Sequence, residues 1–63
     1  MDTLIKVVHP SYYVEILQAL MVCDVWFEYR PATGDVYCHD ISKPEVWDIL
    51  TSEQIESYKF DFV

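Results

Sequence analysis

The alternation of apolar and polar positions predicts four strands. Residues 3–8 (TLIKVV) are β-branched and apolar on both faces, which is typical of a strand in the middle of a sheet. Residues 24–30 and 35–41 each alternate, and the proline and glycine at 31–34 between them predict a four-residue hairpin loop. Residues 57–63 alternate again. The side chains of this last strand that we expect to point inward are Tyr58, Phe60 and Phe62.

The charges beside the hairpin loop indicate the register of its two strands. If Arg30 lies opposite Asp35, then Trp26 lies opposite His39, and both strands sort consistently into an apolar and a polar face. The face expected in the core carries Val25, Phe27, Tyr29, Val36 and Cys38. The opposite face carries Trp26, Glu28, Arg30, Asp35, Tyr37 and His39.

A helix is predicted between the first strand and the hairpin. Residues 12–22 repeat with a helical period, and Pro10 suits the first turn of a helix that Ser11 or His9 can cap. The apolar stripe of this helix consists of Tyr13, Ile16, Leu17 and Leu20. Since the helix is apolar around most of its circumference, we expect Tyr12, Ala19 and Val22 to be covered as well.

A second helix is predicted after the hairpin. It begins at a capping box, S-K-P-E, at residues 42–45, in which the serine and glutamate side chains accept each other's backbone N–H groups. A second box of this type, T-x-x-Q, occupies residues 51–54. The helix therefore either breaks at Thr51 and restarts, or runs on to about Glu56.

The predicted order of elements is β-α-β-β-α-β, in a single α+β domain that spans residues 1–63. One antiparallel sheet with both helices on the same face gives the split βαβ, or ferredoxin-like, arrangement. Right-handed crossovers would place the first and third strands side by side in the middle. The second face of the sheet then has no helix to cover it. The alternative is a looser α+β domain whose C-terminal strand pairs differently or pairs with a second subunit.

Composition and charge narrow the class of protein. The 63 residues include 11 acidic and 4 basic side chains, giving a formal charge of −7, yet 52% are hydrophobic and 16% aromatic. The aromatic content excludes a disordered chain, and the scarcity of basic residues disfavours direct binding of nucleic acid. No apolar run is long enough for a membrane span. The N-terminus has no export signal, so we expect a cytoplasmic protein in which Cys23 and Cys38 are free thiols rather than a bridge.

The small size predicts a marginally stable monomer. A domain of this length buries only about 60% of the surface that its unfolded chain exposes. A second copy or a tightly bound partner would supply additional burial. We therefore expect either a homodimer or a complex with another protein.

Carboxylates gather in the segment 45–56. If this segment is one continuous helix, four of them lie on one side of it. They are Glu45, Asp48, Glu53 and Glu56. The simpler interpretation is a solvated face that keeps an aromatic-rich protein soluble. The functional interpretation is a DNA mimic, whose carboxylates imitate nucleic-acid phosphates and block the basic groove of a nucleic-acid-binding protein.

The polar face of the hairpin is the second candidate surface. The residues that we expect to bind a partner there are Trp26, Glu28, Arg30, Tyr37 and His39. One interpretation is that they only stabilise the hairpin by cross-strand packing. The other is an interface, because exposed Trp and Tyr beside Arg are enriched at binding hot spots.

No pattern of catalytic or metal-binding residues is present. The four candidate metal ligands are His9, Cys23, Cys38 and His39, and their spacing matches no zinc pattern. Cys38 and His39 are consecutive in a strand and therefore point to opposite faces. The chain has no nucleophile elbow, phosphate loop or paired-carboxylate motif. We therefore expect no enzyme activity, no catalytic residue, no metal and no cofactor.

The sequence thus predicts a small acidic interaction protein that binds, and inhibits or regulates, a larger protein with a basic groove. In size, charge and aromatic content, the chain is similar to small bacteriophage accessory proteins that inhibit host machinery, among them anti-CRISPR and anti-restriction proteins. This resemblance implies inhibition of a host protein, and no motif in it assigns a role to a residue. The alternative is a homodimeric regulatory module that binds a small metabolite or nucleotide at the seam between two sheets.

Overall fold

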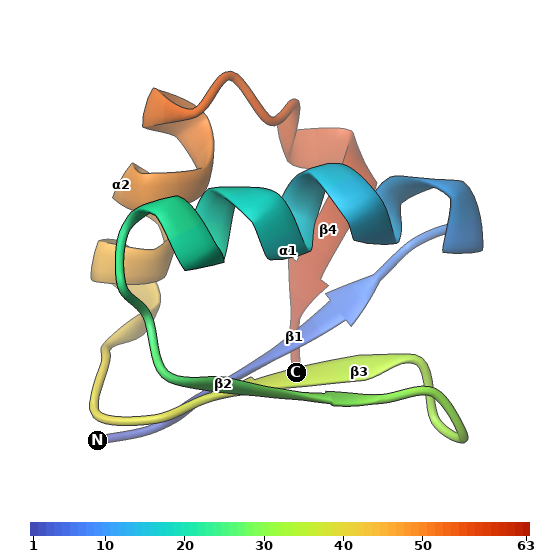
Figure 1. The fold of residues 1–63 in the computed structure, drawn as a ribbon, viewed down its shortest axis with the longest axis horizontal. Helices are drawn as coiled ribbons and strands as arrows, with labels where there is room; N and C mark the ends of the chain where they lie inside the picture. Colours follow the sequence, from blue (N-terminus) through green and yellow to red (C-terminus); the bar gives the residue numbers. More distant parts are fainter.

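Two layers make up the fold, a four-stranded antiparallel sheet and two α-helices that lie on one side of it (Figure 1). The computed structural model describes all residues from 1 to 63. The strands are β1 (Thr3–Val7), β2 (Phe27–Arg30), β3 (Asp35–Cys38) and β4 (Phe60–Phe62). The helices are α1 (Tyr13–Val22), α2 (Lys43–Ser52) and two short 3₁₀ segments, η1 (Pro10–Tyr12) and η2 (Ser57–Lys59).

The strand order across the sheet is β2-β3-β1-β4, and every neighbouring pair is antiparallel. β1 and β3 occupy the middle, as right-handed crossovers require. In the hairpin, Arg30 lies opposite Asp35, which confirms the predicted register. The pairing extends to the end of the hairpin, because the Trp26 carbonyl accepts a hydrogen bond of 2.8 Å from the His39 N–H.

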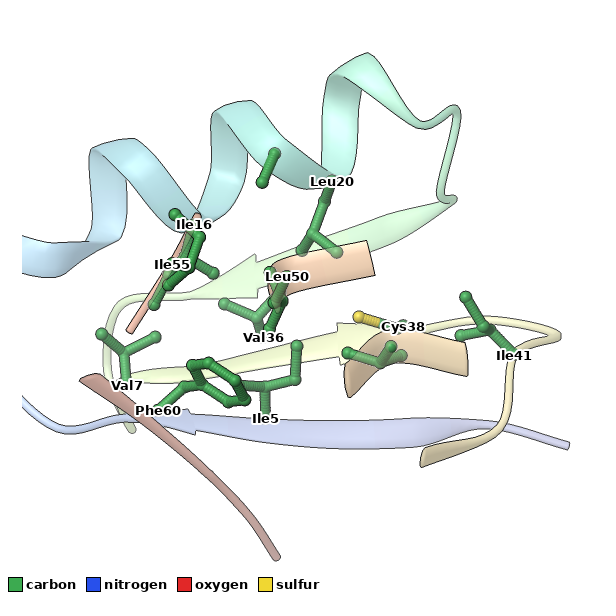
Figure 2. Close-up of a cluster of buried hydrophobic side chains, with 12 residues drawn as sticks. Ile5, Val7, Ile16, Leu20, Val36, Cys38, Ile41, Leu50, Ile55 and Phe60 are labelled. Carbon is green, nitrogen blue, oxygen red and sulfur yellow. The ribbon is translucent and has the colours of Figure 1, made fainter. Parts of the chain in front are cut away.

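One hydrophobic core fills the space between the sheet and the two helices (Figure 2). Its buried residues are Ile5, Val7, Ile16, Ala19, Leu20, Val36, Cys38, Ile41, Val46, Leu50, Ile55 and Phe60. In the strands these residues alternate, and in the helices they are three or four positions apart, so each element turns one face to the core. The predicted core face of the hairpin is confirmed at Val36 and Cys38, whereas Tyr29, in the edge strand, remains 41% exposed.

Side-chain caps begin η1 and α2, whereas α1, which follows η1 directly, has no side-chain cap. At the start of η1, the His9 ring accepts a hydrogen bond of 3.1 Å from the Ser11 N–H. At the start of α2, the Ser42 hydroxyl accepts the Glu45 N–H, and the Glu45 carboxylate accepts the Ser42 N–H in return. These contacts satisfy backbone donors that the first turn of a helix leaves without a partner.

The second capping box does not start a helix. α2 runs through Thr51 and ends at Ser52, and no α-helix restarts after it, so neither predicted alternative is correct. The Thr51 hydroxyl donates to the Trp47 carbonyl at 2.8 Å, within α2, instead of capping a new helix. Gln54 then adopts a left-handed φ of +63°, which takes the chain out of the helical path.

The last strand is shorter than its alternation predicts. β4 begins only at Phe60, and residues 57–59 form η2 instead. Tyr58, predicted to point inward, is therefore 59% exposed. The Lys59 ammonium at the end of η2 lies 2.8 Å from the Glu15 carboxylate of α1. This ion pair joins η2 to α1. The alternation of apolar and polar residues along 57–63 does not predict it.

We expect Gly34→Ala, in the hairpin loop, to destabilise the protein. Gly34 has a φ of +78°, and an added Cβ would lie 2.7 Å from the Tyr13 hydroxyl oxygen. That hydroxyl donates to the Gly34 carbonyl at 2.6 Å and so cannot move away without losing a hydrogen bond. Left-handed strain and the clash together should cost roughly 1–3 kcal/mol of the free energy of unfolding, measured by urea denaturation.

The same substitution in a Tyr13→Phe background separates the two effects. Without the hydroxyl, Gly34→Ala should cost less, because only the left-handed strain remains. Ala32→Ser, at an exposed position of the same loop, is the control and should change the free energy of unfolding by less than about 0.5 kcal/mol. An equal cost of Gly34→Ala in both backgrounds would show that the contact with Tyr13 plays no part.

Candidate interaction surface

The candidate surface is the open face of the sheet, the side that faces away from the helices. One row of residues crosses all four strands there and alternates in charge. In strand order, the row consists of Arg30, Asp35, Lys6 and Asp61. The neighbouring row places Glu28 beside Tyr37, and Tyr37 beside Leu4. Opposite charges are neighbours along the first row, but none of these four side chains forms an ion pair with its neighbour on the next strand.

Three aromatic side chains, which we call the aromatic cluster, gather on this face: Trp26, Tyr37 and His39. The Trp26 ring stacks on the His39 ring, with centroids 4.2 Å apart and planes inclined by 25°. Tyr37 meets His39 edge to face at 4.7 Å. Trp26 is nevertheless 64% exposed. Stacking therefore holds the indole ring in position while most of its surface stays free for a partner.

Two charged side chains border the aromatic cluster. The Arg30 guanidinium lies 5.0 Å from the centre of the Tyr37 ring, a cation–π distance. The Glu28 carboxylate lies 3.7 Å from Arg30 and 3.6 Å from the His39 Nε2. The structure thus brings together all five residues predicted for this surface. Arg30 faces Asp35 in register, but its guanidinium forms an ion pair with Glu28 instead.

The Asp2 carboxylate ties the aromatic cluster to the N-terminus. It accepts hydrogen bonds of 2.5 Å from the Tyr37 hydroxyl and 2.9 Å from the Asp40 N–H. These bonds lower the pKa of Asp2, and the bond to Asp2 raises the pKa of Tyr37. Asp2 is not among the residues that the sequence predicts for this surface. Its one signal is that it alternates in phase with Lys6 and therefore shares the open face.

A hollow of about 380 Å³ lies beside the aromatic cluster. Trp26 and His39 line it together with the side chains of Asp24, Asp40 and Glu45. Asp24 and Asp40 adopt left-handed φ angles of +56° and +55°, which aspartate tolerates better than most residues. The hollow thus combines exposed aromatic surface with negative charge.

The four predicted acidic residues do not form one row. Glu45 and Asp48 belong to α2, but Glu53 and Glu56 follow its end. Glu53 lines a separate hollow, of about 270 Å³, against α1. Glu56 lies 3.7 Å from the Lys59 ammonium. The prediction assumed a continuous helix over 45–56 and is wrong in that respect, because α2 ends before Glu53.

The structure also locates the candidate metal ligands and the thiols. No three histidine, cysteine, aspartate or glutamate side chains come close enough together to hold a metal ion. Cys23 is exposed, Cys38 is buried in the core, and both are free thiols. Burial raises the pKa of the Cys38 thiol to about 11, so this thiol stays protonated at neutral pH. None of the helices is both long enough and apolar enough to cross a bilayer.

Comparisons of the chain with protein-family models, with curated proteins and with solved structures found no match. The function therefore has to be inferred from the chemistry of the surface itself. That chemistry is an exposed tryptophan stacked on His39 beside a hollow lined by acidic residues, with Arg30 over the neighbouring Tyr37 ring.

We expect Asp2→Asn to lower the free energy of unfolding at neutral pH, because a neutral amide accepts the Tyr37 and Asp40 hydrogen bonds more weakly than a carboxylate. Folding lowers the pKa of Asp2. Its stabilisation is therefore complete above the pKa of the unfolded carboxyl and is lost as the pH falls through the folded value. Urea unfolding at a series of pH values should show the two proteins converging in strongly acidic solution.

Asp48→Asn is the matched control, since Asp48 is an exposed carboxylate on α2. It should change the free energy of unfolding little at any pH. A difference between Asp2→Asn and the wild type that stays constant into strongly acidic solution would contradict the role assigned to the Asp2 carboxylate.

Proposed function

We propose that this protein is a non-enzymatic interaction protein that binds a larger protein through the open face of its sheet. The strand order and the two helices on one face fit a ferredoxin-like, split βαβ scaffold, which leaves this face free. The aromatic cluster, with Glu28 and Arg30 beside it, is the contact region. The observation that carries the proposal is Trp26, which is stacked on His39 and yet 64% exposed.

An exposed tryptophan that is held in place favours binding for two reasons. Its ring buries a large apolar area when it is covered, and Trp, Tyr and Arg are the residues most often found at binding hot spots. Because Trp26 already rests against His39, binding costs less conformational entropy than it would with a mobile side chain. A partner that covers the ring thus gains apolar contact without first having to order it.

The charge around the aromatic cluster indicates a basic partner. Asp24, Asp40 and Glu45 are among the residues that line the hollow next to Trp26, and the chain carries a net charge of −7. A lysine or arginine of the partner that entered the hollow would meet these carboxylates and an indole ring, whose face attracts cations. At longer range, the net charge would speed the encounter with a basic surface, and salt would slow it.

The class of partner to test first is a protein that binds nucleic acid through a basic groove, since its charge complements this surface. The similarity to bacteriophage inhibitors in size, charge and aromatic content supports the same choice, with inhibition or regulation of a host protein as the outcome of binding. The exposed free thiol of Cys23 agrees with a reducing compartment such as the cytoplasm.

We expect Trp26→Ala to abolish retention of the partner when the immobilised protein is used for affinity capture from a cell lysate. Truncation of a hot-spot residue weakens binding by about 2 kcal/mol or more, which is roughly thirty-fold. Tyr58→Ala is the matched control, because Tyr58 is 59% exposed but packs on Tyr12 of η1. Proteins held by the wild type and Tyr58→Ala, but not by Trp26→Ala, are the partners. If all three forms retain the same proteins, the aromatic cluster is not the contact region.

Two double substitutions distinguish the contribution of the hollow to binding from that of the acidic segment at 45–56. Asp24→Asn/Asp40→Asn and Glu53→Gln/Glu56→Gln each remove two negative charges, and asparagine tolerates the left-handed conformation at 24 and 40. We expect the first pair to weaken binding of the captured partner by about tenfold at low salt, and the second to change it little. Titration at low and high salt measures both. The reverse result would assign the contact to the acidic segment and favour phosphate mimicry.

A further inference from the structure

At the β4 edge of the sheet, one of the outward backbone donors already has a partner. The Val63 N–H donates to the Leu4 carbonyl of β1, so the alternation of an antiparallel ladder directs the Phe62 N–H away from the sheet. The Asp61 carboxylate accepts this outward N–H at 2.9 Å. Asp61 therefore occupies a donor that an additional strand would need at this edge.

The β2 edge, at the other end of the sheet, is open. The His39 N–H donates to the Trp26 carbonyl, so alternation along β2 directs the N–H and C=O groups of Phe27 and Tyr29 outward. Unlike the Phe62 N–H, the N–H groups of Phe27 and Tyr29 have no side-chain acceptor. An edge strand with free outward N–H and C=O groups is a template for pairing with another strand.

The sequence of β2 complements itself. If two β2 strands pair antiparallel about a twofold axis at Tyr29, Glu28 of each copy lies opposite Arg30 of the other. The outward N–H groups of each strand then face the Tyr29 and Pro31 carbonyls of the second copy. An axis at Glu28 would oppose two carboxylates, and an axis at Arg30 would oppose two guanidinium groups. Of these three registers, charge favours the one centred on Tyr29.

A second apolar stripe of α1 borders the same edge and consists of Tyr13 and Leu17, which are half-buried against the core, and the exposed Met21. Tyr13 packs against Tyr29 of β2, with ring centroids 4.7 Å apart, so this side of α1 lies over β2. Leu17 and Met21 follow Tyr13 at intervals of four and continue along that side of the helix. Met21 is 63% exposed, and Val14, next to the stripe, is 66% exposed. If two β2 strands pair, the α1 stripes of the two copies lie beside the line where the strands meet, on the face of the sheet that carries the helices.

We propose that two copies of this chain form a homodimer by antiparallel pairing of β2 with β2, centred on Tyr29. The two four-stranded sheets then become one continuous sheet. The α1 stripes cover its helical side at the seam, and two reciprocal Glu28–Arg30 pairs lie on its open side. The dimer does not depend on the proposed partner binding. It would present two aromatic clusters on one face, so that a partner with repeated sites would be bound with avidity.

Charge-swap variants test this pairing. Sedimentation equilibrium from micromolar to millimolar concentration gives the Kd of the wild-type dimer. Glu28→Arg or Arg30→Glu alone opposes like charges at two symmetric sites, and we expect the Kd to rise about tenfold or more. The double variant Glu28→Arg/Arg30→Glu restores opposite charges and should return the Kd to the wild-type value. Circular dichroism of each variant checks that the chain still folds.

Hydrogen exchange of backbone amides gives a readout that needs no substitution. At concentrations where the dimer dominates, the Phe27 and Tyr29 amides should be protected, and dilution to the monomer should remove the protection. Three results would each overturn the proposal: a monomer at all concentrations, single reversals that dimerise as tightly as the wild type, or a dimer in which these two amides exchange freely. None of them affects the capture experiment with Trp26→Ala, so failure of the dimer and failure of partner binding are distinguishable.

Discussion

Burial of only one face of the sheet is the constraint on which the rest of the structure depends. Two helices on one side enclose a core of twelve residues, and none of the elements between residues 1 and 63 covers the other side. In a domain this small, that core is the main source of stability. Each strand therefore carries apolar residues inward and has to stabilise its outer face by other means.

Contacts between neighbouring strands stabilise the open face. The Trp26 and His39 rings stack, the Arg30 guanidinium lies over the Tyr37 ring, and the Asp2 and Glu28 carboxylates lie against the Tyr37 hydroxyl and the His39 Nε2. Such contacts fix side chains in position without removing them from solvent. The arrangement that stabilises an uncovered sheet therefore also presents a positioned aromatic surface. The same side chains stabilise the hairpin and form the proposed contact region.

The hairpin could be predicted from the sequence almost completely, and the C-terminal third only in part. Opposite charges at Arg30 and Asp35, beside a four-residue loop, define a register locally, so alternation alone identified the residues of the aromatic cluster. The end of α2 and the turn after it involve a left-handed Gln54 and an ion pair between Lys59 and Glu15, which no periodic pattern reports. The hollow was missed for a related reason, because its carboxylates come from separate turns that only the fold brings together.

The two tryptophans allow the most direct test of the claim that the open face is the binding surface. Trp26 belongs to the aromatic cluster, whereas Trp47 lies on α2 and packs against Phe60. In an isotope-labelled sample, their indole N–H groups give two separate nuclear magnetic resonance signals. When a captured partner is titrated in, we predict that the Trp26 signal shifts or broadens while the Trp47 signal keeps its position. A Trp47 signal that moves while the Trp26 signal stays unchanged would contradict this claim.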